Sequence, residues 1–306
     1  MSVRRPGMDH ELYCYSALPA RPLVRWPGEA PVAVWVVLFL EYWELATPPG
    51  QHRAPGVHGH WGHFFPDYRT YSYREYGHRV GIFRVLECLD RYAIPVTVAA
   101  NASALVRYPE LVEECVRRGW EIVPHGSHAT RMITSAMSEA DERSVIEVAI
   151  AAVRQATGAM PQGWMSQDYN ESTRTPALVA QAGMRWLSDW PNDEQPYWMT
   201  VDPPIVSIPQ QPEWDDVQML WLRQLPMPRY PAVIRNALDG LAIDGKQSAR
   251  TMCLGVHPWL LGQPHRIRYL DEALKILATS PDVWMASGSA IASAFSAGAP
   301  PPAIRP

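Results

Sequence analysis

Val32-Ala-Val-Trp-Val-Val-Leu-Phe-Leu40 is the longest uninterrupted apolar stretch of the 306-residue chain. It is rich in β-branched and aromatic residues, and polar residues do not alternate with them as they do in a half-exposed strand. This pattern is typical of a parallel strand whose two faces are both covered by helices. The run is about half as long as the ~20 residues that a transmembrane helix needs. It therefore predicts the central strand of a parallel sheet.

Strand-like and helical patterns alternate after this segment. A helix is expected over Val80–Tyr92, and a second helix between Pro109 and Gly119. Ser138 with Asp141 predicts the capped start of a third helix, which ends at Gly158. Further strands are expected at Pro95–Ala100, Trp120–Pro124, Gly163–Ser166, Met184–Ser188, Ile205–Ile208, Met252–Val256 and Val283–Ala286, with helices near Pro176–Ala182, Tyr230–Leu241 and Tyr269–Leu277.

This alternation predicts a (β/α) barrel of about seven parallel strands. An open doubly wound sheet is the alternative, but no glycine-rich phosphate loop follows any of the strands. We expect residues 1–295 to form one domain and residues 296–306 to form a flexible Ala/Pro-rich tail.

Composition excludes several classes of protein. Lys plus Arg is 27 and Asp plus Glu is 31, so the net charge of −4 lacks the basic footprint of a nucleic-acid-binding protein. The four cysteines are scattered, and no apolar stretch follows the N-terminal arginines as it does in a signal peptide. We therefore expect a cytoplasmic protein that does not contact membranes, binds a small molecule and assembles with copies of itself.

Polar residues stand directly after several predicted strands. Glu41 follows the first strand, Asn101 the second and His125 the third, while Asp189 and Asp193 follow a later one and His257 the last long one. In a parallel barrel, functional groups gather at the carboxyl ends of the strands. The alternative is that these residues cap helices, satisfy loop amides or, for Glu41, pair with an arginine.

The histidines suit two kinds of chemistry. His125 and His128 are three residues apart, so they share one face if the segment turns helically, and they could then bind a metal. His128 is equally consistent with a solvated or capping role. His257 precedes Pro258, which ends the strand, and a histidine there suits a general acid because its ordinary pKa is near neutral.

The long segment Glu44–His78 is dense in Pro, Gly, His and aromatic residues. We expect it to be a loop over the mouth of the barrel. Its histidines His58, His60 and His63 have no nearby carboxylate, so structural or substrate-lining roles are favoured for them. Aromatic residues expected at the mouth, where they either pack or stack on a flat ring, are Trp43, Trp61, Tyr197, Trp198, Trp214 and Trp259.

Several of these segments together resemble the polysaccharide deacetylase superfamily, specifically its branch of metal-independent allantoinase-like proteins and cyclic imide hydrolases. The resemblance covers roughly residues 20–295. The matching segments are Tyr73-Arg-Glu-Tyr-Gly-His-Arg-Val-Gly-Ile-Phe-Arg84, Tyr108-Pro-Glu-Leu111, His125-Gly126 with Thr130-Arg131, Asp189-Trp190 with Asp193 and Gln195-Pro196, and His257-Pro258 through Gly262-Gln-Pro-His-Arg266 to Leu270-Asp271.

The resemblance implies a distorted (β/α) barrel that hydrolyses a non-peptide C–N bond, with His257 at the position of the catalytic acid. Deacetylases of the superfamily also carry two aspartates after the first strand and two metal-binding histidines four residues apart. This chain has Leu40-Glu41 and Ala129 at those positions. The cofactor is accordingly either one zinc-like divalent ion on Glu41, His125 and His128, or none.

We therefore predict a hydrolase of a small amide, most plausibly a cyclic imide or ureide. Glu41 acts on the attacking water and His257 protonates the leaving nitrogen, while Asp193 orients His257. Predicted substrate contacts are Asn101, Arg131, Trp198 and Trp259. Two alternatives remain open: an N-deacetylase of an acetylated amino sugar, and a catalytically silent small-molecule-binding protein on the same fold.

Overall fold

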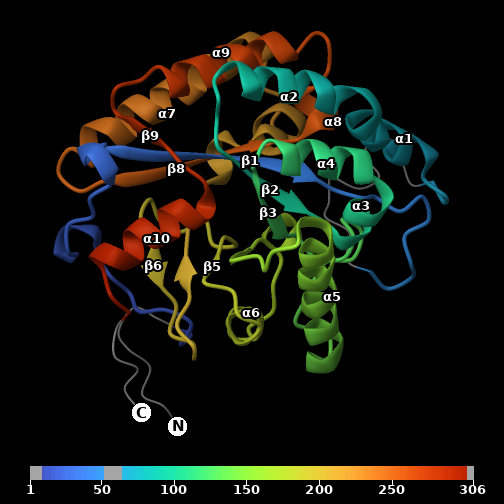
Figure 1. Ribbon diagram of the computed structural model, residues 1–306, viewed down its shortest axis with the longest axis horizontal. Coiled ribbons are helices and arrows are strands. Elements are labelled where there is room, and N and C mark those ends of the chain that lie inside the picture. Colours follow the sequence, from blue (N-terminus) through green and yellow to red (C-terminus); the bar gives the residue numbers. More distant parts are fainter. Residues whose placement is uncertain (1–8, 52–63, 302–306) are drawn as a thin grey trace.

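The computed structural model describes residues 9–51 and 64–301, which form two parallel-stranded sheets surrounded by helices (Figure 1). Strand β1 (Val32–Leu40) is the centre of the first sheet, and all nine of its residues are buried. It pairs in parallel with β8 (Arg250–Val256), with β2 (Val96–Ala100) and with β9 (Val283–Met285). Strand β3 (Glu121–Pro124) continues the sheet beyond β2. The predicted central parallel strand is therefore confirmed.

The second sheet has the order β4-β5-β7-β6. Its strands are β4 (Gly163–Trp164), β5 (Trp186–Leu187), β6 (Tyr197–Trp198) and β7 (Val206–Ser207), of which only β6 runs antiparallel. The backbone N–H of Met165 donates to the carbonyl of Pro124 at 3.2 Å and joins this sheet to β3. At the opposite side, the Gln211 side chain bonds to the backbone of Thr251 and Cys253 in β8. The predicted α/β class is confirmed. Hydrogen bonds from the Met165 backbone and the Gln211 side chain connect the region of the second sheet to the first.

Alternate residues of the first sheet face different cores. In β1, the residues at positions 32, 34, 36, 38 and 40 belong to the core between the sheet and the helices. Ala33, Trp35, Val37 and Phe39 belong to the core that lies against the second sheet. Because successive side chains in a strand point to opposite faces, the residue after Leu40 points to the same inner side as Phe39. This parity decides where Glu41 lies.

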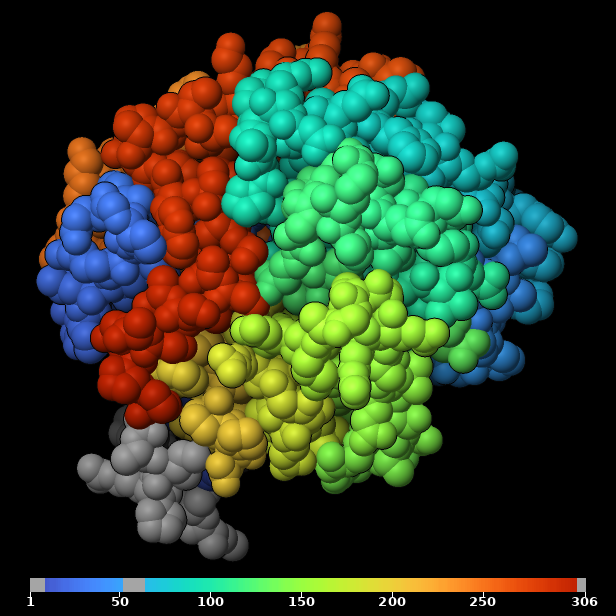
Figure 2. Space-filling view, in the orientation of Figure 1, coloured from blue at the N-terminus to red at the C-terminus, as the bar shows by residue number. Residues whose placement is uncertain are grey.

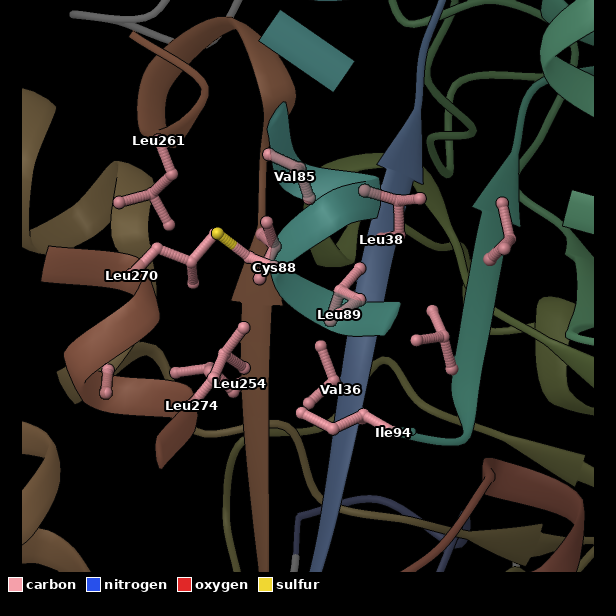
Figure 3. Packing of buried hydrophobic residues seen from close by; sticks show 14 of the residues in the cluster. Val36, Leu38, Val85, Cys88, Leu89, Ile94, Leu254, Leu261, Leu270 and Leu274 are labelled. Atoms are coloured by element: carbon pink, nitrogen blue, oxygen red, sulfur yellow. The ribbon is translucent and has the colours of Figure 1, made fainter. Parts of the chain in front are cut away.

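Three helices cover the outer face of the first sheet (Figure 1). They are α2 (Ile82–Arg91), α7 (Tyr230–Gly245) and α9 (Ile267–Ala278). Figure 3 shows Val85 and Leu89 of α2 beside Val36 and Leu38 of β1. The other α-helices are α3 (Ala102–Arg107), α4 (Pro109–Arg117), α5 (Glu139–Thr157), α6 (Thr175–Gln181), α8 (Pro258–Leu261) and α10 (Gly288–Gly298).

The segment before β1 lies beside the C-terminal third of the chain, as the adjoining blue and red surfaces in Figure 2 illustrate. The Trp26 indole donates to the carbonyl of Arg250 at 2.7 Å and lies 5.9 Å from the Trp284 ring. These contacts cover the amino-end of the first sheet, so the opposite end is the one left for a site. No helix within residues 9–51 and 64–301 is both long enough and apolar enough to cross a membrane.

The predicted helix ends are confirmed where a side chain or a glycine defines them. Ser138 accepts the backbone N–H of Asp141 at 3.2 Å and caps α5. The same helix ends at Gly158, whose φ of 73° is in the left-handed region. Pro109 begins α4, as expected.

Two expectations about loops were wrong. Part of the segment Glu44–His78 is helical, because Asp67 accepts the backbone N–H of Thr70 and caps α1 (Tyr68–Tyr76). A π-helical turn over Gly77–Gly81 then joins α1 directly to α2. The Ala-rich start of the expected tail is also helical: α10 extends to Gly298, and its Phe295 is buried. His58, His60, His63 and Trp61 lie outside the described residues.

The π-turn contacts α8 without room for a side chain between them. A Cβ on Gly81 would lie 2.2 Å from the carbonyl oxygen of Pro258, and a Cβ on Gly77 would lie 2.6 Å from the backbone nitrogen of Trp259. Glycine therefore allows two backbones to approach closely, and this contact fixes the π-turn against the residues that follow β8.

We predict opposite effects for two glycine substitutions. Gly81→Ala should lower the free energy of unfolding by about 1–3 kcal/mol, because the new methyl group overlaps rigid backbone. Gly240→Ala in α7, where nothing lies within 4 Å, should raise it by about 0.5–1 kcal/mol. Urea denaturation measures both, and a Gly81→Ala protein as stable as the wild type would contradict the close approach.

Candidate active site

Four predicted site residues meet at the carboxyl end of the first sheet. Glu41, Asn101, His125 and His257 follow β1, β2, β3 and β8, and all four are buried. Each continues the inward-facing parity of its strand, as Phe39, Ala99, Val123 and Cys253 do in the inner core. Strand pairing thus brings together four residues that are distant in the sequence.

Glu41 is a buried carboxylate with polar neighbours on both oxygens. Gln167 donates its side-chain N–H to Oε1 at 2.5 Å, and the Trp43 indole donates to Oε2 at 3.3 Å. Nε2 of His125 lies 3.6 Å from Oε1. Burial alone raises the pKa of Glu41, but the positive charge of His257 and the hydrogen bond from Gln167 help to bring it well below its ordinary value. Glu41 is therefore ionised at neutral pH.

His125 presents one ring nitrogen to Glu41. Its Nδ1 lies 2.9 Å from the carbonyl oxygen of Met165, which can only accept, so we assign the proton to Nδ1. Nε2 then carries the lone pair, is buried, and has no hydrogen-bond partner within the described residues. A buried nitrogen without a partner beside a carboxylate is suited to accept a proton from a bound water or substrate.

Asn101 helps to hold Glu41 and His125 in place through hydrogen bonds. Its amide nitrogen donates to the carbonyl of His125 at 2.5 Å and to Oε1 of Gln167 at 3.2 Å, while its oxygen accepts the N–H of Tyr42 at 2.9 Å. The side chain is fully buried. We therefore expect Asn101 to position other residues, although the sequence suggested a substrate contact.

His257 is held by a carboxylate that the sequence reasoning missed. Asp216 accepts the backbone N–H of His257 at 2.7 Å and bonds to its Nδ1 at 2.6 Å. The imidazole stacks on Phe39 with ring centroids 4.2 Å apart. Burial lowers the pKa of His257, but the charge and hydrogen bond of Asp216 outweigh it and raise the pKa to about 9. The imidazole is therefore protonated at neutral pH.

Asp193, the partner expected for His257, lies in a different contact. It forms an ion pair with Arg21 at 2.7 Å and accepts the backbone N–H groups of Glu194 and Gln195. The loop after β5 thus directs this aspartate towards the N-terminal segment. Asp189 accepts the N–H of Ser166 at 2.6 Å and so supports the start of the turn that carries Gln167.

Three other predicted residues have partners outside the Glu41–His125–His257 group. Arg131 makes a two-pronged bond to Glu44. His128 is half-buried beside Tyr42, with ring centroids 6.0 Å apart. The Trp198 indole donates to the carbonyl of Ala299 near α10. Of the four predicted substrate contacts, only Trp259 lines the pocket at Glu41.

The pocket at Glu41 is narrow, with a volume of about 10 Å³. Its lining residues are Phe39, Glu41, Trp43, Arg74, Gly77, His78, Pro258 and Trp259. Arg74 comes from α1 and is buried. Arg74 lies in Tyr73–Arg84, one of the segments that resemble the superfamily, so the sequence contained a signal that it belongs to the site. Nothing in the sequence showed that its helix would reach the pocket.

Asp168 is another residue that the sequence did not indicate. It has a φ of 50°, and the next residue, Tyr169, has a φ of 58°. Two successive non-glycine residues in the left-handed region are uncommon and often occur at functional sites. The Asp168 side chain is exposed to solvent. The surrounding protein and the negative charge of Glu41 raise its pKa.

The positions of the His and carboxylate side chains show which groups could bind a metal ion. Among residues 9–51 and 64–301, one group of three potential ligands lies together: Asp215, Asp216 and His257. Asp216 already binds His257, and Oδ1 of Asp215 accepts the N–H groups of Val217 and Gln218. The expected trio of Glu41, His125 and His128 does not form such a group. The donor positions therefore do not support a metal centre on Glu41, His125 and His128, and no catalytic step below uses a metal ion.

An ionised carboxylate and a protonated histidine thus follow two adjacent strands, an arrangement that suits acid–base hydrolysis. The chain matches the polysaccharide deacetylase family over residues 75–187. A Schizosaccharomyces pombe protein named for the same family is 28% identical over 248 residues, which are 73% of this chain and 75% of that protein.

Two solved structures are similar over almost their whole length. A Pseudomonas aeruginosa protein named for polysaccharide deacetylases is 27% identical, with a TM-score of 0.77 over 92% of this chain and 96% of that one. The PuuE allantoinase is 26% identical, with a TM-score of 0.77 over 92% and 95%. This chain is therefore similar to the polysaccharide deacetylase superfamily in its fold and over residues 75–187.

We predict that Asp216, and not Asp193, sets the pKa of His257. NMR titration should give a pKa of about 9 for His257 in the wild type. Asp216→Asn should lower this pKa by at least two pH units, because burial then acts without the compensating carboxylate. Asp193→Asn should leave it unchanged, since Asp193 binds Arg21. Equal effects of the two substitutions would contradict the assignment.

Proposed function

We propose that the chain hydrolyses a C–N bond in a small cyclic imide or ureide. The observation that carries this proposal is the narrow pocket in which Glu41 faces Trp43, Arg74 and Trp259. A closed pocket buries most of the surface of a small flat ring, whereas a polymer needs an open groove. The similarity to an allantoinase over 92% of the chain supports the same class of substrate.

The nucleophile in this proposal is a water molecule between Glu41 and His125. Oε1 and Nε2 are 3.6 Å apart, so one water can donate a hydrogen bond to each of them. The lone pairs of that water then point away from both acceptors and towards the substrate carbonyl. As the C–O bond forms, one proton of the water passes to this pair.

His257 serves as the acid in the second half of the reaction. The protonated ring donates its Nε2 proton to the nitrogen as the C–N bond breaks, while Nδ1 stays bonded to Asp216. The ring opens to a carboxylic acid and an amide whose nitrogen keeps the proton from His257. The acid then releases the second proton of the water to solvent and becomes a carboxylate, and the first proton of the water leaves the Glu41–His125 pair and restores the proton of His257. A general acid or base of this kind typically contributes 10²–10⁴ in rate. Asp216 therefore acts as a positioning residue.

A sugar N-deacetylase is the second candidate. A Helicobacter pylori peptidoglycan deacetylase is 27% identical over 124 residues, which are 40% of this chain. The same acid and base would suit an acetamide, so substrate size separates the two candidates. Self-assembly and a cytoplasmic location stay predictions.

We predict that the purified protein opens succinimide, hydantoin or allantoin and acts at least tenfold more slowly on N-acetylglucosamine oligomers. The physical reason is that the pocket at Glu41 is narrow and lined by aromatic rings, whereas a polymer needs an open groove. Liquid chromatography with mass detection measures the ring-opened acids and released acetate in the same reactions. Release of acetate without any ring opening would replace this function by deacetylation, and turnover of neither would favour a silent binding protein.

We further predict that kcat/KM falls tenfold per pH unit above about pH 9, because His257 must carry its proton and loses it as pH rises through its pKa. His257→Gln should lower kcat by about 10²–10⁴ and remove this alkaline decline. The matched control is His265→Gln, since His265 is exposed. An unaltered pH profile in His257→Gln would reject the assigned acid.

A further inference from the structure

Arg74 is a buried cation in the wall of the proposed pocket. Only 2% of the residue is exposed, and its guanidinium carbon lies 3.3 Å from the centroid of the Trp259 ring. Trp43 and Trp221 lie at 4.6 and 5.5 Å from the same carbon. Burial lowers the pKa of Arg74 to about 10, which still leaves it charged at neutral pH.

Stacking on indole rings orders the guanidinium in a useful way. The rings contact the flat faces of the group, whereas its N–H donors lie in its plane and point out from its edge. The close contact of Gly77 with Trp259 fixes α1 relative to the end of β8. Arg74 is therefore presented to the pocket in one orientation.

A fixed cation at this place suits an oxygen that gains negative charge. Water addition to a carbonyl turns its oxygen into an oxyanion, and ring opening leaves a carboxylate on the same carbon. Glu41, Asp168 and Asp216 already contribute negative charge near Arg74. A neutral ring adds no negative charge. The ring-opened product is therefore the first species of the proposed reaction that places an anion in the pocket.

We propose that Arg74 is a specificity-determining residue that binds the reacting carbonyl oxygen and then the carboxylate of the ring-opened product. This inference rests on the function proposed above, because that reaction creates the carboxylate. It predicts that the site prefers an open-chain half-amide acid to the neutral diamide of the same size. The preference should depend on Arg74 even when no reaction takes place.

The experiment compares binding of succinamate, an anion, and succinamide, its neutral counterpart, by titration calorimetry at pH 7.5. The wild-type full-length protein should bind succinamate at least tenfold more tightly, as expected for a charge-assisted hydrogen bond. Arg74→Met should reduce this ratio to about one. Arg74→Gln is neutral and polar and serves the same purpose if the methionine variant does not fold.

Arg79→Met is the matched control, because Arg79 lies five residues further along, in the π-turn, and is exposed. Its ratio should equal that of the wild type, and circular dichroism checks that each variant is folded. A wild-type ratio near one, or an unchanged ratio in a folded Arg74 variant, would overturn the proposal. An Arg74-dependent ratio in a protein that opens no imide would support the subsite and reject only the proposed reaction.

Discussion

The central constraint of this structure is an ionised carboxylate at the end of a fully apolar strand. Strand β1 has no polar residue, and Glu41 follows it directly. Removing such a charge from water is costly unless hydrogen bonds and opposite charges replace the lost hydration. Gln167, Trp43 and His125 supply contacts from three different segments, and His257 supplies positive charge. The ends of β1, β3 and β8 must therefore come together for Glu41 to remain charged.

The second charged pair of the site is Asp216 with His257. A glycine on the inner face of the first sheet leaves space for Asp215, the neighbour of Asp216. Gly255 lies in β8 where a Cβ would come within 2.5 Å of Oδ2 of Asp215. Asp215 in turn begins the π-helical turn Val217–Leu222 by accepting two of its backbone N–H groups. Burial and the adjacent charge of Asp216 raise the pKa of Asp215 to about 7. The energetic cost of placing two aspartates side by side is offset by the protonated His257.

The sequence predicted those parts of the site that depend on strand ends. Glu41, His125 and His257 follow predicted strands, and the parity of those strands sets the direction of their side chains. Asp216 and Gln167 could not be found in this way, because they lie on loops whose course depends on packing against other elements. Asp193 was wrong as the partner of His257 for the same reason: a loop end does not fix which neighbour a carboxylate meets.

Phe39 helps to keep His257, the acid, protonated and Glu41, the base, ionised. Opposite charges such as those of Glu41 and His257 tend to neutralise each other by proton transfer if they share a hydrogen bond. The Phe39 ring stacks flat on His257 at 4.2 Å and lies 5.4 Å from the His125 ring, so an apolar surface adjoins both histidines. Asp216, on the other side, offers His257 a better partner at Nδ1. Strand β1 therefore supplies both the base and, two residues earlier, the aromatic ring that stacks against the acid.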